Sequence, residues 1–220
     1  MTDRHGTDKR VVETLYFEVQ YMIKSMVEKI EKIISENVFG EEVEYFESYK
    51  KVTGATEKEL QAFESEFSIS LPDDFKELYK YKNGSSYPFQ LLYTLYDEEC
   101  LSPFFLLSLD EIREAKTHFC NEDKHMKDYD DYFSDEDIDK LDKRIKPFLY
   151  NKKWIPFAQM VGGSIYLMLD FDPTEKGVSG QIIIYVHDPD FIYYVSKDIK
   201  DLLQDTIENL EYGCYDEFHE

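Results

Sequence analysis

The sequence predicts an α+β fold: an antiparallel sheet of about five to six strands, helices packed mainly on one face, and a long N-terminal helix. Strand-like segments gather in the middle and later part of the 220-residue chain, and helical patterns flank them. This order is typical of helices that cover one face of an antiparallel sheet. Hydrophobic residues make up 42% of the chain and aromatic residues 16%, which is enough for a sizeable core and unlike a disordered sequence.

The first predicted element is an amphipathic helix over residues 8–38. Its main apolar stripe consists of Val12, Leu15, Val19, Met22, Met26, Ile30 and Ile33. Four further apolar residues widen this stripe: Tyr16, Ile23, Val27 and Ile34. So broad a stripe is typical of a helix packed against its own domain. A dimerisation helix or a partner-binding arm is the alternative. Gly40 is expected to end the helix, and residues 41–53 are expected to form a linker.

Residues 54–84 predict two short helices. Thr56, with Glu59 three residues later, forms a capping box for the first of them. Pro72 suits the first turn of the second helix, where a missing N–H costs nothing. Asp73 and Asp74 lie where the helix dipole favours negative charge, and Asn83-Gly84 is expected to end the second helix. The residues expected to be buried are Leu60, Phe63, Phe67, Phe75, Leu78 and Tyr79.

The remaining elements are read from β-branched and aromatic runs and from helical spacing. The expected strands are 89–96, 103–107, 154–157, 164–170, 181–187 and 191–195. Residues 164–169 are nearly all apolar, which predicts a central strand. Ser108 and Glu111 form a second capping box, and Ser196 is expected to cap the last helix. The inward residues of that helix are predicted to be Ile199, Leu202, Leu203, Thr206 and Leu210.

Residues 121–146 form an acidic segment interrupted by aromatic residues, which we interpret as an insertion. The residues expected to contact a partner are Asp128, Tyr129, Asp130, Asp131, Tyr132, Asp135 and Glu136. Aromatic side chains are enriched at protein interfaces, which favours this role. The alternative is that Tyr129, Tyr132 and Phe133 pack into the core while the acids face water. Ser134 is expected to cap a short helix.

The formal net charge of −22 limits the classes of partner. Direct binding to nucleic acid is not expected, because that affinity comes largely from Lys and Arg that neutralise phosphates. An anionic membrane would also repel the chain, and no segment approaches the length of a membrane span. Basic proteins or cations are the expected partners. The alternative is that the acidity serves only solubility.

Cysteine content indicates the expected compartment. Cys100, Cys120 and Cys214 are odd in number and widely spaced, so no disulfide framework is indicated. A reducing cytoplasm is expected, because disulfides are rare there. The N-terminal segment also lacks the apolar run that is typical of a signal peptide.

Asp170 and Asp172 are the first candidates for catalytic chemistry. Two carboxylates at a strand end could hold Mg²⁺, which prefers oxygen ligands. The alternative is a structural role, in which Asp170 accepts hydrogen bonds from loop amides and Asp172 opens a turn with Pro173. We favour the structural role and expect no metal site and no cofactor.

Histidine, cysteine and serine give weaker candidates. His118, Cys120 and His125 lack the second close pair of ligands that a zinc site usually has. His187 has no evident nucleophile near it in the sequence, and no Gly-x-Ser-x-Gly elbow is present. Catalytic residues are therefore not assigned.

Two blocks of the sequence form a pattern that is more specific together than either block is alone. The first is Gly54-Ala55-Thr56 before an acidic helix, then Leu71-Pro72-Asp73-Asp74-Phe75 and a short helix that ends at Asn83-Gly84. The second comprises Trp154-Ile155-Pro156-Phe157-Ala158, Gly162-Gly163, the run from Tyr166 to Pro173, and Gly180-Gln181-Ile182-Ile183. Together these two blocks resemble the SUKH superfamily (the Smi/Knr family). The resemblance covers roughly residues 52–210. It implies structural roles for Leu71, Pro72, Phe75, Gly84, Trp154, Asp170 and Gly180.

The resemblance also implies a domain division and a class of function. A SUKH-like α+β domain is expected over residues 52–220, after an N-terminal helical extension over residues 1–51. Bacterial SUKH proteins are mostly immunity proteins, so the resemblance implies a non-enzymatic protein that neutralises a cognate toxin. That toxin is expected to be basic, and nucleases are the class of toxin considered. A regulatory scaffold of the Smi/Knr type is the second hypothesis. A divalent-metal phosphodiesterase or transferase built on Asp170 and Asp172 is the third. A dimer through the N-terminal helix is also considered.

Overall fold

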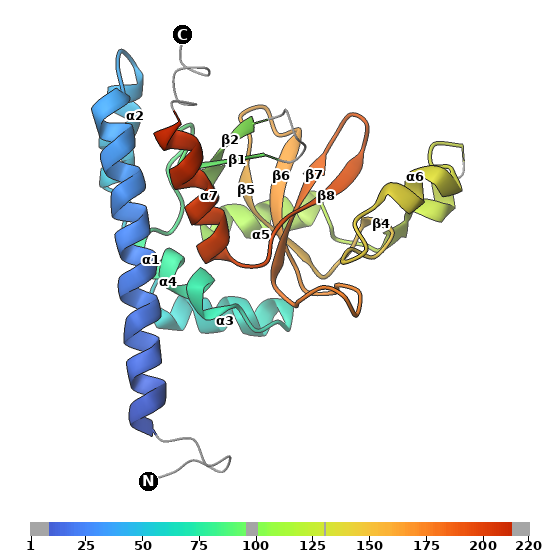
Figure 1. Ribbon diagram of the computed structural model, residues 1–220, viewed down its shortest axis with the longest axis horizontal. Coiled ribbons are helices and arrows are strands. Elements are labelled where there is room, and N and C mark those ends of the chain that lie inside the picture. The colour runs from blue at the N-terminus through green and yellow to red at the C-terminus, as the bar shows by residue number, and fades with distance from the viewer. Residues whose placement is uncertain (1–8, 96–100, 130, 213–220) are drawn as a thin grey trace.

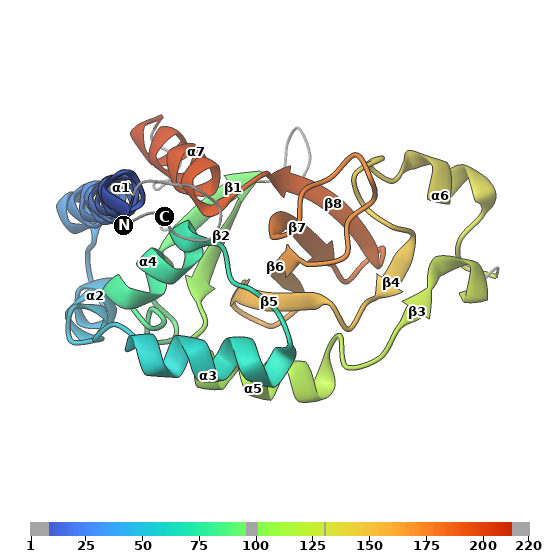
Figure 2. The ribbon, with the colours of Figure 1, turned by 90° about the horizontal axis from the view of Figure 1, so that it is seen from below.

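A six-stranded antiparallel sheet lies at the centre of the protein (Figures 1 and 2). The computed structural model describes residues 9–95, 101–129 and 131–212. The strands lie in the order β1-β2-β5-β6-β7-β8. Their bounds are Leu92–Leu95, Leu101–Leu106, Trp154–Gln159, Ile165–Asp170, Gln181–Val186 and Phe191–Ser196. A second sheet pairs β3 (Lys124–His125) with β4 (Phe148–Tyr150), and sequence analysis did not predict it.

Seven α-helices are present among the described residues. Their bounds, from α1 to α7, are Lys9–Asn37, Glu42–Lys50, Glu57–Phe67, Asp73–Tyr81, Leu109–His118, Asp135–Lys140 and Ile199–Glu211, and a 3₁₀ turn, η1, spans Met126–Tyr129. The predicted α+β class with an antiparallel sheet and a long N-terminal helix is therefore confirmed.

Both faces of the sheet are covered, and β7 shows this most clearly. Every residue of β7 is buried. Ile182 and Ile184 pack into the main hydrophobic core, on the side of α1, α4 and α7. The alternate residues Ile183 and Tyr185 join a second hydrophobic cluster on the opposite face. Side chains in a strand alternate between the two faces, so a strand covered on both sides is apolar throughout.

The segment that covers the second face carries the predicted acidic insertion. We call residues 121–150, which include β3, η1, α6 and β4, the acidic lobe. Met126, Phe133, Leu141, Ile145 and Leu149 of the lobe pack with Trp154, Met168 and Ile192 of the sheet. The lobe is therefore anchored on the sheet through a hydrophobic cluster of its own.

The long helix α1 packs on α4 and α7 along one side of the molecule (Figure 1). Ile23, Val27, Ile30 and Ile34 are fully buried, while Val19, Met22, Met26 and Ile33 are half-buried beside them. The centre of the buried face is thus displaced toward the residues that were expected only to widen it. Val12, Leu15 and Tyr16 lie outside the part of α1 whose side chains are described.

Residues 42–50 form helix α2, where the sequence predicted a linker. Phe46 and Tyr49 are its buried residues, and Tyr49 stacks on Phe89 with ring centroids 4.5 Å apart. The Nζ of Lys82 donates to the carbonyl oxygens of Tyr49, Lys50 and Val52 at 3.3, 3.2 and 2.9 Å. Tertiary packing and this lysine stabilise a helix whose own apolar pattern is too short to predict it.

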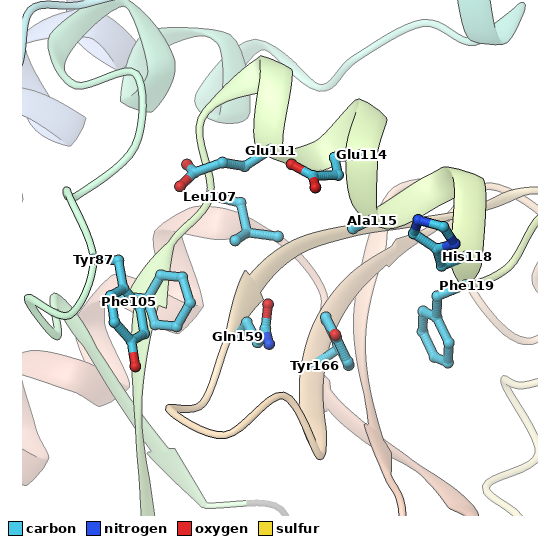
Figure 3. A pocket seen from close by; sticks show the side chains of 10 residues that line it. All are labelled: Tyr87, Phe105, Leu107, Glu111, Glu114, Ala115, His118, Phe119, Gln159 and Tyr166. Atoms are coloured by element: carbon cyan, nitrogen blue, oxygen red, sulfur yellow. The ribbon is translucent and has the colours of Figure 1, made fainter.

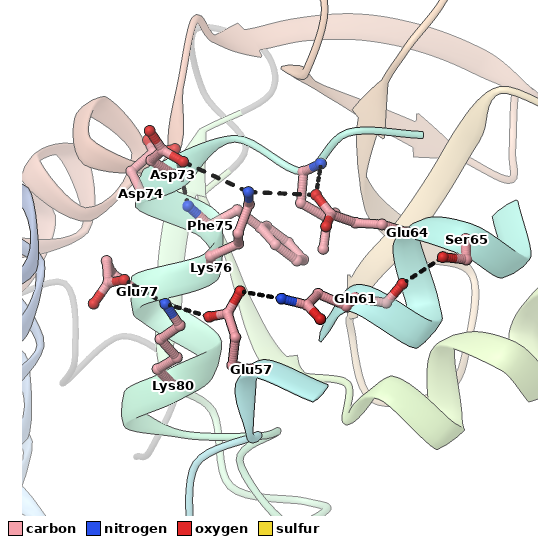
Figure 4. Close-up of polar contacts among 11 residues, drawn as sticks. Glu57, Gln61, Glu64, Ser65, Asp73, Asp74, Phe75, Lys76, Glu77 and Lys80 are labelled. Carbon is pink, nitrogen blue, oxygen red and sulfur yellow. Dashed lines mark hydrogen bonds and ion pairs between the residues drawn. The ribbon is translucent and has the colours of Figure 1, made fainter. Parts of the chain in front are cut away.

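Helix α3 of the α3–α4 hairpin begins at the predicted start signal. The capping box of Thr56 and Glu59 is present, and Lys80 lies 2.9 Å from Glu57 of α3 and 3.0 Å from Glu77 of its own helix (Figure 4). A Cβ atom at Gly54 would lie 1.7 Å from the carbonyl oxygen of Lys80. Only glycine allows this close approach of the two segments.

Two helix starts differ from the sequence predictions by one or two residues. Pro72 is the N-cap of α4 rather than a residue of its first turn. Asp198, not Ser196, caps α7, because the Asp198 carboxylate accepts a hydrogen bond from the N–H of Asp201. Ser196 instead ends β8 and donates to the Asp198 carbonyl. The buried residues predicted for the last helix are confirmed.

Candidate functional site

The acidic lobe projects from the end of the molecule that lies farthest from α1 (Figures 1 and 2). Its neighbouring aromatic residues face in different directions. Phe133 is only 9% exposed and Tyr129 is half-buried against the same cluster, whereas Tyr132 is 81% exposed. Packing into the core, the alternative drawn from the sequence, therefore holds for Phe133 and in part for Tyr129 but not for Tyr132. The lobe places one large aromatic ring in solvent.

Exposed acids lie close to Tyr132 in the sequence. Asp131, Asp135 and Glu136 are all exposed, and none of them has an ion-pair partner among the described residues. Asp128 is exposed too, and its carboxylate accepts a hydrogen bond from the N–H of His125 at 3.3 Å. Asp130 lies outside the described residues. The lobe thus presents exposed carboxylates that form no ion-pair contact within the described residues, on the segment that carries an exposed ring.

Helix α6 fixes the position of these acids. Ser134 caps it as predicted, and Asp137, three residues later, completes a capping box. The Asp137 carboxylate also lies 2.8 Å from Lys140, and this contact, with the Ser134 hydrogen bonds, lowers the pKa of Asp137 to about 2. Asp135 and Glu136 occupy the first turn, where the helix dipole favours negative charge. The charges of the lobe are therefore held on a capped helical turn.

A groove that the sequence did not predict opens between α5, β2 and the β5–β6 hairpin (Figure 3). It encloses about 380 Å³. Its walls are Tyr87, Phe105, Leu107, Glu111, Glu114, Ala115, His118, Phe119, Gln159 and Tyr166. Tyr87, Gln159 and Tyr166 are far in the sequence from the residues of β2 and α5, so no local motif could have identified the whole groove. The helical spacing of Glu111, Glu114, Ala115 and His118 is the one signal that indicates a shared face.

Asp170 and Asp172 have structural partners. The buried Asp170 carboxylate accepts hydrogen bonds from Trp154 Nε1 at 3.0 Å, Gln181 Nε2 at 2.9 Å and the N–H of Asp172 at 2.8 Å. Asp172 accepts from Asn151 Nδ2 at 3.0 Å and forms an ion pair with Lys146. Asp170 thus joins β5, β6 and β7 to one another, and Asp172 ties Lys146 of the acidic lobe to the end of β6.

The candidates for a metal or a nucleophile are dispersed. Cys120 is buried, which raises the pKa of its thiol to about 12, whereas His118 and His125 are exposed. No group of three or more His, Cys, Asp or Glu side chains suited to a metal ion occurs within residues 9–95, 101–129 and 131–212. Cys100 and Cys214 lie outside these ranges. The exposed His187 is hydrogen-bonded to Asp190, which raises the pKa of the imidazole.

The comparison with known protein families decides the assignment. The model of the SMI1/KNR4 family (SUKH-1) matches residues 54–205, which is well over half of the chain. The chain belongs to the SMI1/KNR4 family (SUKH-1). No curated protein matches the chain. The SUKH-1 match runs from Gly54, two residues before the cap of α3, into α7, and it includes the whole acidic lobe.

Residues of the two blocks that carry the family resemblance are buried or in close contact in the folded domain. Leu71, Phe75 and Trp154 are each no more than 2% exposed. Gly180 has a φ of +85°, and a Cβ there would lie 2.6 Å from Cγ of Pro72. The two blocks of the family pattern therefore touch at a point where glycine is required. In this chain the Leu-Pro segment and the β6–β7 turn support each other.

SUKH-1 membership supports a coarse functional class. The family includes immunity proteins, and a protein partner is what it suggests for this chain. No helix among the described residues has both the length and the apolar character that crossing a bilayer requires.

Proposed function

We propose that this SUKH-1 protein is an immunity protein that binds a cognate basic toxin and neutralises it by protein–protein contact. One observation supports it most strongly: the acidic lobe presents the exposed ring of Tyr132 among Asp131, Asp135 and Glu136, which lack ion-pair partners among the described residues. Aromatic anchors are enriched among residues that dominate binding energy. The surrounding carboxylates complement a cationic surface.

The net charge of −22 supports the same partner class. Proteins that grip nucleic acid carry Lys and Arg to neutralise phosphates, so a nuclease toxin presents a cationic surface. An acidic protein can occupy that surface and exclude the nucleic acid. Electrostatic steering can raise association rates to roughly 10⁸–10⁹ M⁻¹s⁻¹ at low salt. Fast capture would protect the cell that makes the toxin.

The metal-dependent enzyme receives less support from the geometry. Both Asp170 and Asp172 already accept hydrogen bonds or an ion pair from neighbouring side chains. A cation at this position would have to displace Trp154, Gln181 or Lys146 from contacts that hold the sheet and the lobe together. No specific observation favours the regulatory scaffold.

Co-expression with the toxin region encoded beside this chain's own gene tests the proposal. We expect the two proteins to purify as a complex and the chain to restore growth of cells that make the toxin. A Tyr132→Ala variant should weaken the complex without loss of folding, because the ring is in solvent. Absence of both complex and protection, with each protein folded, would overturn the proposal. So would turnover of a substrate that one side-chain substitution in this chain abolishes.

A further inference from the structure

One wall of the groove beside α5 carries polar side chains that form no hydrogen bond or ion pair with other described residues. Leu109 and Ile112 form the buried face of α5, while Glu114, Ala115 and His118 line the groove (Figure 3). The Glu114 carboxylate and the His118 imidazole are exposed and have no hydrogen-bond or ion-pair partner among the described residues. An amphipathic helix normally turns such groups to open solvent. Here they face a hollow.

The opposite wall is aromatic and also has free hydrogen-bonding groups. Tyr166 stacks on Phe119 with ring centroids 4.9 Å apart and an interplanar angle of 21°. Tyr87 meets Phe105 edge to face at 5.1 Å. The Tyr166 hydroxyl and the side-chain amide of Gln159 have no partner within the described part of the chain, and Figure 3 shows both side chains at the groove.

The chemistry of the lining selects one kind of occupant. Its residues include Glu111 and Glu114 but no Lys or Arg. The carboxylate of Glu111 accepts a hydrogen bond from the N–H of Ser108 at 2.7 Å, so Glu114 is the freer of the two. A guanidinium stacks on aromatic faces and pairs with a carboxylate through two N–H groups. A carboxylate, aromatic rings and free acceptors in one hollow match that combination.

We propose that the groove binds an arginine side chain presented by the protein partner. The inference rests on the proposed function, since the arginine belongs to the toxin, but it concerns a surface separate from Tyr132 and α6. Glu114 supplies the counter-charge, and Tyr166 and Phe119 supply the aromatic wall. The partner would then be held at two places, by charge at the acidic lobe and by one inserted side chain at the groove.

A peptide titration tests the groove without the toxin. The probe is Ac-Ala-Gly-Arg-Gly-Ala-NH₂, and its control is the same peptide with citrulline, which has a similar shape but no charge. The full chain is labelled with ¹⁵N and amide shifts are followed. We expect saturable shifts at Ala115, His118, Phe119 and Tyr166, with citrulline binding at least about fivefold weaker. Equal binding of the two peptides, or shifts confined to other surfaces, would overturn the inference.

Two matched variants locate the charge. Glu114→Gln removes the groove carboxylate and should weaken the arginine peptide about fivefold. Glu175→Gln makes the same change on an exposed turn beyond β6, at the end opposite Tyr166, and should leave binding unchanged. Both variants should melt like the parent. Unaltered binding by the Glu114 variant contradicts the groove assignment but not toxin neutralisation. If the chain bound the arginine peptide but not the toxin, toxin neutralisation would be contradicted and the groove assignment would stand.

Discussion

Asp170 is a buried carboxylate whose protonation should be coupled to folding. Burial raises its pKa to about 6, although Trp154, Gln181 and the N–H of Asp172 donate to the ionised form. The pKa of an unfolded Asp is about 4. A folded-state pKa above the unfolded one means that this contribution to stability is fully present below pH ~4 and is lost as pH rises through ~6.

An Asp170→Asn variant should therefore have a flatter pH profile. Between pH 4 and pH 7 its free energy of unfolding should fall by less than the parent's, by a difference on the order of 3 kcal/mol. Urea unfolding followed by circular dichroism measures this. Tryptophan fluorescence is unsuitable here, because the indole of Trp154 donates to Asp170. Asp131→Asn, at an exposed position, is the control. If the Asp170 variant kept the parent's slope, the carboxylate would not titrate as proposed.

Lys82 joins helix α2 to the rest of the domain. Its ammonium group donates to three carbonyl oxygens at and after the end of α2. Lys82→Met keeps the aliphatic stem and leaves these acceptors without their donor. We expect a loss of about 1–3 kcal/mol in the free energy of unfolding, because unsatisfied buried groups carry a desolvation penalty. Chemical denaturation measures the loss. Lys58→Met, at an exposed site on α3, should change stability little.

Helix α1 should be needed for the stability of the SUKH-1 domain, although the family match begins after it. Ile30 is fully buried in the main core, and α1 packs on both α4 and α7. Ile30→Ala should cost about 2–5 kcal/mol, the usual range for such truncations in a core. Denaturation followed by the fluorescence of Trp154, the only tryptophan, measures the cost.

Tyr21→Ala is the matched control on the same helix. Tyr21 is 77% exposed, so its truncation should stay within about 0.5 kcal/mol of the parent. Comparable losses for both variants would mean that the exposed side of α1 is also buried, as in a dimer through this helix. Light scattering at the concentration used for unfolding would then show a mass above that of one chain.

Local signals predicted much of the fold. The three capping boxes at Thr56, Ser108 and Ser134 need only a hydroxyl and an acid three residues apart, and all three are present. The continuous apolar run of β6 indicated a central strand, and β6 lies between β5 and β7. The extra helix α2 was missed because its nine residues have a weak apolar pattern and depend on contacts with Phe89 and Lys82.

The candidate surfaces were less predictable for a geometric reason. Tyr132 and Phe133 are neighbours of similar hydrophobicity, yet one ring is in solvent and the other is in the second cluster. Only the path of the chain through η1 and α6 decides which ring points inward. The groove depends on Tyr87, Glu114 and Tyr166, which the fold alone brings together. Composition led to the expectation of a basic partner and gave no position for its contacts.

The charge of the molecule leads to a prediction about the kinetics of toxin binding. At 0.15 M ionic strength the Debye length is about 8 Å, so added salt screens the approach of two charged proteins more than their close contacts. The association rate constant should therefore fall steeply as salt rises, and the dissociation rate constant should change less. Reversal of Asp130, Asp131 and Asp135 to Lys should likewise slow association more than it speeds dissociation.

A second triple variant separates the position of charge from its amount. Reversal of Glu18, Glu36 and Glu44 to Lys alters the net charge equally, at exposed positions on α1 and α2. These helices lie at the end of the molecule opposite the acidic lobe (Figure 1). If the lobe directs the encounter, this variant should associate faster than the lobe variant in stopped-flow measurements at low salt. Equal slowing by both would mean that net charge alone steers binding, and the lobe would lose its assigned role.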